Sequence, residues 1–346
     1  MRLGVLDIGS NSAHLRVVDA YPGSPPLPVC RHKAATGLAE AIRRDGAITS
    51  PGVRRLVVAV CAAMDEARAQ RVAELIPFVT SAVRDAANRD EILTALRAEA
   101  GLEVGYLSGE EEARLTYFAA HRWFGWSAGP LLLLDIGGGS LEIAQGRDED
   151  PTLAVSLPLG AGRLTRAFLR DHPAGRRQVK RLQDHVHEAL APTVQRLHWE
   201  GHPGTVVATS KTFKQLARFA GRSDPAAASR LLHRQDVRAW IPRLAEMTPD
   251  QRAALPGVRP ARARQLLAGV VVAAVTMKAL GIETVQICPW ALREGILLRR
   301  LAPQPTADAL RQVRLIESIS AGVGVGAGEG SGVSDLDEYR QARRTN

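Results

Sequence analysis

The chain has 346 residues, of which 45% are hydrophobic, and this length suits two hydrophobic cores better than one. Its net charge of +9 favours a polyanionic partner, yet only five of the 45 basic residues are lysines, a skew typical of genome-wide composition. Aromatic residues make up 4% and do not interleave with the basic ones, which argues against nucleic acid as a partner. Three distant cysteines without a C-x-x-C pair argue against a disulfide framework and a zinc site.

The start of the chain predicts neither export nor membrane insertion. Residues 3–7 follow Met1 and Arg2 directly and read as a first strand, not as an apolar leader. The longest strongly apolar stretch, residues 266–277, is shorter than the roughly 18 residues that a membrane-spanning helix needs. We therefore expect a cytoplasmic protein without a membrane partner.

Two similar strand–turn–strand segments stand near the starts of the two halves of the chain. Each has an apolar run that ends in aspartate, then a turn of glycine and serine, then a second apolar run: VLDIGSNS at residues 5–12 and LLDIGGGS at residues 133–140. The repeat predicts a duplicated α/β lobe with a cleft between the copies. We place an N-terminal lobe at residues 1–127 and a C-terminal lobe at residues 128–302.

Strands and helices alternate along the rest of the chain, as expected for an α/β architecture. Helices are predicted at residues 53–73, 88–100, 110–123, 176–198 with an interruption near Pro192, 260–280 and 292–301, and strands at residues 73–79, 104–107, 153–158, 205–208 and 284–287. From Pro303 onward proline and glycine accumulate, with glycine at every second position from Gly322 to Gly332. Residues 303–346 therefore read as a disordered tail.

The second turn, from Asp135 to Ser140, has the composition of a phosphate cradle. Three consecutive glycines, Gly137–Gly139, let backbone N–H groups approach an anion, and Asp135 can hold a divalent cation or a water beside it. A plain hairpin turn would use the same glycines, but the related turn in the other half favours phosphate binding. Strand alternation places Glu142 near Asp135 across the hairpin, where the two can share a cation; the alternative is an exposed strand carboxylate.

Three glutamates begin the helix that follows Ser108. Ser108 and Glu111 have the spacing of a capping box, and all three glutamates suit the positive end of the helix dipole. This structural account covers Glu111 well and Glu110 in part. Glu112 is left without such an explanation and is the better candidate for a catalytic base.

Two basic residues follow predicted strands, at the edge where open α/β sheets bind ligands. Arg84 lies in the segment TSAVRDA, and an arginine can bind a phosphate with two hydrogen bonds. It is weak evidence alone because arginine is so abundant, whereas Lys211, in ATSKT, is one of five lysines and lies among hydroxyl residues. His14 is expected to have only a structural place near the first hairpin.

Taken together, these motifs resemble the exopolyphosphatase / guanosine pentaphosphate phosphohydrolase (Ppx/GppA) family. That family belongs to the actin, Hsp70 and sugar-kinase superfamily, so the resemblance implies a duplicated actin-like, ribonuclease H-like α/β fold with two lobes. It resembles the short, two-domain exopolyphosphatases, since the C-terminal helical domains of the longer members have no counterpart. The matching stretches run in family order from residue 6 to residue 298: LDIGSNSAHL, VTSAVRDAANR, LSGEEEARLTYF, LLLDIGGGSLEI, LPLGAGRLT, VATSKTF, RPARARQLLAGVVV and ICPWALREGILL.

The resemblance also implies a role for each candidate residue. Glu112, the glutamate directly before Ala-Arg, is the general base. Mg²⁺, with Mn²⁺ as the alternative, and the attacking water are positioned by Asp135, Glu142 and Asp7. Phosphate is bound by the two turns and by basic residues, namely Ser10, Asn11, Ser12, Gly137, Gly138, Gly139, Ser140, Arg84, Lys211 and Arg262.

The function implied by the resemblance is hydrolysis of the terminal phosphoanhydride bond of inorganic polyphosphate. Guanosine pentaphosphate, a substrate tied to the stringent response, stays open because removal of its terminal phosphate needs the same chemistry. An ATP-binding actin-like or sugar-kinase protein is disfavoured, since residues 205–212 hold no adenosine-binding Gly-Gly motif. A phosphate-binding sensor without activity is disfavoured by the intact set of carboxylates. Related proteins are often dimers, so a homodimer is expected by analogy.

Overall fold

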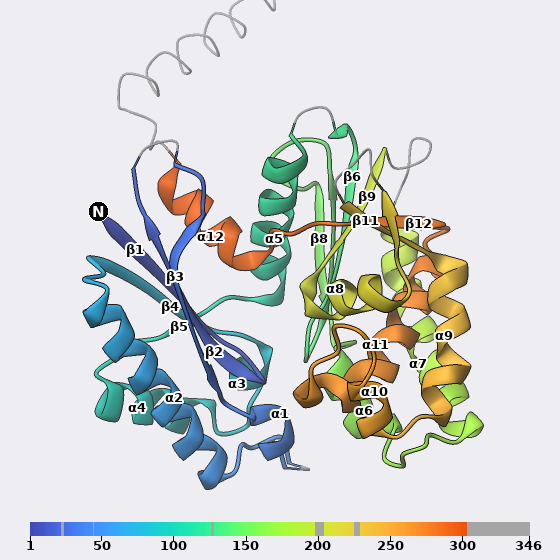
Figure 1. Cartoon of the computed structure of the whole chain (residues 1–346), viewed down its shortest axis with the longest axis horizontal. Helices are drawn as coiled ribbons and strands as arrows, with labels where there is room; N and C mark the ends of the chain where they lie inside the picture. Colours follow the sequence, from blue (N-terminus) through green and yellow to red (C-terminus); the bar gives the residue numbers. More distant parts are fainter. Residues whose placement is uncertain (22–23, 44, 126–127, 198–203, 225–228, 303–346) are drawn as a thin grey trace, which may run out of the picture. The chain divides into compact units, whose positions relative to one another are not determined.

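The computed structural model describes residues 1–302 apart from residues 22–23, 44, 126–127, 198–203 and 225–228, and it shows two β-sheets flanked by helices (Figure 1). The tail predicted at residues 303–346 lies outside the described residues. Within the described residues, no helix combines the length and apolarity needed to cross a membrane.

The first sheet has five strands in the order β3-β2-β1-β4-β5. Strands β1 and β2 form an antiparallel hairpin, β3 extends it in the antiparallel sense, and β4 and β5 continue the other side in parallel. The elements of this half are β1 (Arg2–Ile8), β2 (Ser12–Asp19), β3 (Pro28–Ala35), α1 (Leu38–Ala41), α2 (Ser50–Ala69), β4 (Glu74–Val79), α3 (Ser81–Arg84), α4 (Arg89–Ala100), β5 (Gly105–Tyr106) and α5 (Gly109–Phe124).

The second sheet has seven strands in the order β10-β11-β12-β9-β6-β7-β8. Read from β8, the strands β8-β7-β6-β9-β12 repeat the order and the directions of the first sheet, and β11 and β10 extend its edge. The predicted duplication of an α/β lobe is therefore confirmed. The elements are β6 (Leu131–Ile136), β7 (Leu141–Gly146), β8 (Leu153–Leu157), α6 (Ala161–Phe168), α7 (Arg176–Arg196), β9 (Thr205–Thr209), α8 (Ser210–Phe219), β10 (Arg222–Asp224), β11 (Ser229–His233), α9 (Arg234–Glu246), α10 (Pro249–Ala253), α11 (Pro260–Ala279), β12 (Thr284–Ile287) and α12 (Leu292–Leu301).

Helices cover both faces of each sheet, which explains why the central strands are apolar along their whole length. Alternate residues of β6 point to opposite sides: Leu132 belongs to the large core with α7 and α11, whereas Leu131 packs with residues of α5. In the first sheet, Leu6 packs with α2 and α4, whereas Val5 packs with α12. Asp7 and Asp135, each one residue before the end of its strand, therefore lie between two buried layers.

Helices α5 and α12 connect the two halves. Helix α5 comes from the first half of the chain and packs on the second sheet, whereas α12 comes near the end of the described chain and packs on β1 (Figure 1). The two helices also pack against each other. The sequence-based boundary between residues 127 and 128 stays a prediction.

Gly295 allows α12 to lie directly on α5, because a Cβ at this position would overlap the carbonyl oxygen of Leu115. Leu115 lies one turn beyond Glu112, so the same contact fixes the start of α5. We expect Gly295→Ala to lower the free energy of unfolding by about 1–3 kcal/mol, as overpacking does, and to lower the melting temperature measured by calorimetry. Gly105→Ala, which meets only ordinary contacts, is the control. Equal melting temperatures for the two variants would contradict this account of the helix contact.

The predicted helices and strands are present, with shifted ends, but one interruption is wrong. Helix α7 continues through Pro192 to Arg196, because the buried Leu190 and Thr193 hold its last turn in place. The sequence also missed several elements, among them β3 and α8. Strand β3 begins with a proline and alternates half-buried with exposed side chains, which is typical of an edge strand and hides the apolar signal.

Candidate active site

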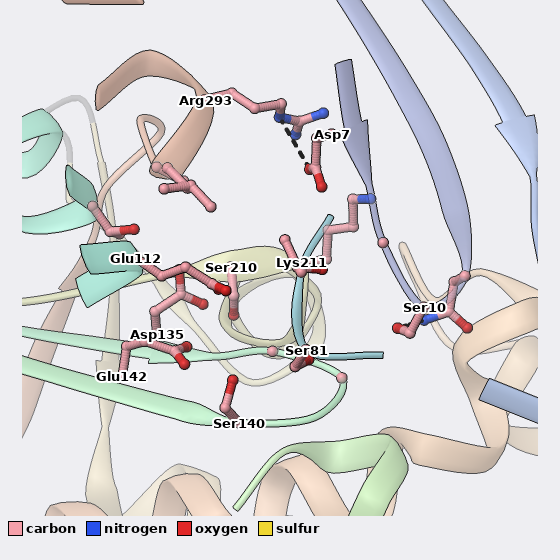
Figure 2. A pocket seen from close by; sticks show the side chains of 18 of the residues that line it. Asp7, Ser10, Ser81, Glu112, Asp135, Ser140, Glu142, Ser210, Lys211 and Arg293 are labelled. Atoms are coloured by element: carbon pink, nitrogen blue, oxygen red, sulfur yellow. Dashed lines mark hydrogen bonds and ion pairs between the residues drawn. The ribbon is translucent and has the colours of Figure 1, made fainter. Parts of the chain in front are cut away.

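A cavity of about 170 Å³ lies where the two hairpin turns face each other, and residues from both halves of the chain line it. Figure 2 shows Glu112, Asp135 and Glu142 together on one side of this pocket and Asp7 and Lys211 on the other. The structure thus brings together most of the predicted site residues, which are Asp7, Ser10, Asn11, Ser12, Glu112, Asp135, Gly137, Gly138, Ser140, Glu142, Lys211 and Arg262.

The two turns are built in the same way. The N–H of Gly9 donates to the carbonyl of Ser12 at 3.2 Å, and the N–H of Gly137 donates to the carbonyl of Ser140 at 2.9 Å. Behind each turn, a carbonyl accepts a hydrogen bond from the start of a helix: Ser10 from α1 and Gly138 from α6. Within the described residues, the N–H groups of Gly138 and Gly139 form no backbone hydrogen bond. Free N–H groups on a tight turn are the donors that bind phosphate in other proteins.

Gly160 supports the second turn from behind. A Cβ at this position would overlap the backbone of Gly139 and Ser140, so only glycine lets α6 approach the turn. We expect Gly160→Ala to displace the turn and to lower kcat/KM for phosphate release by about 10²-fold, the usual result of an ångström-scale misplacement. The far-ultraviolet circular dichroism spectrum should stay that of the wild type. Retention of full activity would show that the turn does not position the substrate.

Three carboxyl groups gather at the second turn. Asp135 and Glu142 are direct partners in the antiparallel β6–β7 ladder, and Glu112 enters from the first turn of α5. Glu142 is 4% exposed and its Oε1 accepts a hydrogen bond from the Ser156 hydroxyl at 2.9 Å. The predicted capping box is present: Ser108 and Glu111 exchange their hydrogen bonds, which leaves Glu112 free to point into the pocket.

Burial raises the pKa of each of these carboxyl groups. It raises the pKa of Asp135 to about 6 and that of Glu142 to about 8, where the charge of Asp135 adds to the effect. The pKa of Glu112 is well above its ordinary value, first because of burial and then because of Glu142, while Arg84 acts in the opposite sense. Buried carboxylates that repel one another are stabilised by a cation.

The donor set of this site suits a hard divalent cation. It consists of carboxylate and hydroxyl oxygens, which Mg²⁺ prefers and which do not favour zinc. Within the described part of the chain, no group of three or more His, Cys, Asp or Glu side chains is gathered closely enough to hold a metal alone. This fits Mg²⁺, which usually takes one or two carboxylates and completes its shell with water and substrate phosphate.

Two predicted phosphate-binding residues do not line the pocket. The guanidinium of Arg84 forms ion pairs with Glu112 and Asp85 and donates to the carbonyl of Leu107 at 3.0 Å. Its evident contact is with the predicted base, and phosphate binding by Arg84 stays a prediction. Gly139 lies against Ser81 at a smaller neighbouring cavity.

Several pocket residues were missed by the sequence analysis. His14 lines the pocket rather than holding only a structural place: its Nε2 lies 2.8 Å from Nζ of Lys211 and 2.7 Å from Oγ of Ser12. Burial and the charge of Lys211 lower the pKa of His14 to about 2, so the neutral ring can accept a hydrogen bond from the lysine. The pairing of His14 with Asp7 in the hairpin is the signal that could have revealed it.

Ser210 and Arg293 also line the pocket. Ser210 has a φ of 77°, a left-handed conformation that is strained for a residue with a Cβ and that turns the chain sharply from β9 into α8. This turn directs Lys211 into the cleft.

Arg293, at the start of α12, approaches Asp7 with 3.8 Å between its Nε and the carboxylate Oδ2 (Figure 2).

Comparison with known proteins gives this site a context. Residues 17–303 match the Ppx/GppA phosphatase family. Exopolyphosphatase 1 of Mycobacterium tuberculosis is 49% identical over 314 residues, which cover 90% of this chain and 91% of that protein. Exopolyphosphatase 1 of Mycobacterium leprae is 48% identical over 315 residues, which cover 90% and 93%. The crystal structure of an exopolyphosphatase from Cytophaga hutchinsonii, 24% identical, has the same fold with a TM-score of 0.78 over 87% of this chain and 98% of that one. With a match that spans most of its length, the chain belongs to the Ppx/GppA phosphatase family and is a hydrolase with the duplicated actin-like fold.

Proposed function

We propose that this protein is an exopolyphosphatase, which hydrolyses the terminal phosphoanhydride bond of inorganic polyphosphate and releases orthophosphate. The observation that carries the proposal is the pocket itself, where a carboxylate cluster faces two phosphate-type turns and the basic side chains of Lys211 and Arg262. The relatives named exopolyphosphatase, at 48% and 49% identity, support polyphosphate as the substrate.

In this proposal Glu112 is the general base. It takes a proton from the water that attacks the terminal phosphorus, in line with the bond to the rest of the chain. Its raised pKa makes it a stronger base than an exposed glutamate, and its ion pair with Arg84 holds the carboxylate in one orientation. The shortened polyphosphate is the leaving group, so no covalent intermediate with the protein is required.

Asp135 and Glu142 would hold a divalent cation, Mg²⁺ or Mn²⁺, on which members of this family generally depend, and Asp7, on the other side of the pocket, would help to position it through water. The cation would neutralise charge on the phosphoryl oxygens that flank the reacting bond. In this proposal the protein itself binds the phosphates and excludes bulk water. The donors are N–H groups of the two turns, the hydroxyls of Ser10, Ser12 and Ser140, and the basic side chains of Lys211 and Arg262.

The rival substrate within the family is guanosine pentaphosphate, whose terminal phosphate would fit the same carboxylates and turns. No particular contact in the described residues favours it over polyphosphate. A cytoplasmic location and a homodimer stay predictions.

The test is phosphate release, with Mg²⁺ present, from short-chain polyphosphate and separately from guanosine pentaphosphate. Release from polyphosphate with the higher kcat/KM supports the proposal. Release from the nucleotide alone would assign the protein to the other branch of the family. Release from neither substrate, with tight binding of polyphosphate, would indicate a sensor instead of an enzyme.

A further inference from the structure

Three side chains form a row across the first sheet. The strand register pairs Asp7 on β1 with His14 on β2, and His14 with Lys33 on β3. Residues that are paired directly on neighbouring strands point to the same face of a sheet. Asp7 and His14 line the pocket, whereas Lys33 lies on the edge strand, its backbone about 10 Å from that of Asp7 at ordinary strand spacing. The row therefore leads from the pocket outward.

A second row leads outward from the other half of the chain. Arg262, in the first turn of α11, lines the pocket. Arg259, the N-cap residue of the same helix, is exposed outside the pocket three positions earlier, the spacing of neighbours on one helix face. Each half of the chain thus contributes one basic residue outside the pocket, Lys33 or Arg259, and the second half adds Arg262 inside it.

The start of α11 lies against the first hairpin, because the side-chain amide of Gln265 donates a hydrogen bond to Oδ1 of Asn11 at 3.5 Å. Burial lowers the pKa of Lys33, the charges of Arg259 and Arg262 lower it further, and no carboxylate acts on it in the opposite sense. Neither Lys33 nor Arg259 forms an ion pair with any carboxylate among the residues that the structure describes. Cations that repel one another without a counter-charge attract a polyanion strongly.

We propose that Lys33 and Arg259 form an outer subsite, which binds phosphates several units behind the terminal one. The polyphosphate chain then has a fixed direction: its end lies at Glu112 and Asp135, and the rest leaves the pocket past His14 and Lys211 between the two outer cations. This inference rests on the proposed function, because it needs a substrate whose negative charge repeats along its length. The outer subsite selects for chain length, whereas the carboxylates act on the terminal bond alone.

The test is binding as a function of chain length, measured by titration calorimetry in a Glu112→Gln background that does not consume the ligand. The ligands are tripolyphosphate, a chain of intermediate length, a long chain and guanosine pentaphosphate. Lys33→Gln/Arg259→Gln should raise the Kd of the long chain about tenfold, because two exposed charge pairs with phosphate are lost. The Kd of tripolyphosphate should rise less than about twofold. The matched control is Arg54→Gln/Lys278→Gln, which removes the same charge from exposed positions outside both rows.

Three results would overturn the outer subsite. The first is an unchanged Kd of the double variant for the long chain. The second is an increase in Kd by the same factor for every chain length, and the third is an equal increase in Kd for the control variant. If the Kd of guanosine pentaphosphate rises as much as that of the long chain, the outer subsite does not select for a repeating phosphate chain. Failure of the proposed function is seen separately, as absence of phosphate release by the wild type, and does not affect the dependence of Kd on chain length.

Discussion

Glu112→Gln is expected to lower kcat for phosphate release from polyphosphate by about 10²- to 10⁴-fold, the range that loss of a general base produces. Glutamine keeps the shape of the side chain and can still donate or accept a hydrogen bond, but it cannot take a proton from water. The ion pair with Arg84 is lost, yet the turns and the basic residues proposed to bind phosphate are unaltered. We therefore expect the Kd for polyphosphate to change by only a few-fold.

The matched control is Glu111→Gln, one residue earlier on the same helix. Glu111 closes the capping box with Ser108, and glutamine serves that position equally well. The control should keep the activity and the melting temperature of the wild type. If Glu112→Gln retains more than about a tenth of the activity, the base lies elsewhere. Glu142, whose pKa is raised to about 8, is then the next residue to test.

The features that the sequence predicted correctly are those that depend on one segment of chain. The capping box of Ser108 and Glu111 lies within one helical turn, and the pairing of Asp135 with Glu142 lies within one hairpin. The duplication could be read because the same turn occurs twice and the strand order around it is repeated. Local spacing specifies such geometry before any long-range contact is known.

The features that the sequence missed depend on contacts between distant segments. Arg293 reaches Asp7 only because α12 packs on β1, at the other end of the chain, through apolar residues that carry no sign of a nearby carboxylate. The ion pair of Arg84 with Glu112 likewise joins the end of α3 to the start of α5. His14 looked structural because its partner, Lys211, lies in the other half. Which charges meet across a cleft is decided by lobe packing, and a single sequence does not show it.

The second large effect is expected from the carboxylates that would hold the cation. Burial raises the pKa of Asp135 to about 6 and that of Glu142 to about 8, above the values near 4 of an unfolded chain. The folded protein therefore keeps protons that the unfolded chain releases, and these two groups make the cation-free protein less stable as pH rises from about 4 to about 8. A divalent cation binds only the deprotonated oxygens, so its affinity should increase over the same interval.

We expect Mg²⁺ to raise the melting temperature little at about pH 5 and by several degrees at about pH 8, as a ligand of the folded state does. The variant Asp135→Asn/Glu142→Gln should lose this effect of Mg²⁺ and most of the phosphate release. Without Mg²⁺ at about pH 8 it should melt higher than the wild type by about 2 °C or more, because two buried charges are removed. Glu99→Gln removes an exposed carboxylate and is the control. If Mg²⁺ raises the melting temperature of the double variant as much as that of the wild type, the cation does not bind at Asp135 and Glu142. The positive charge that the proposed chemistry requires would then also lie elsewhere.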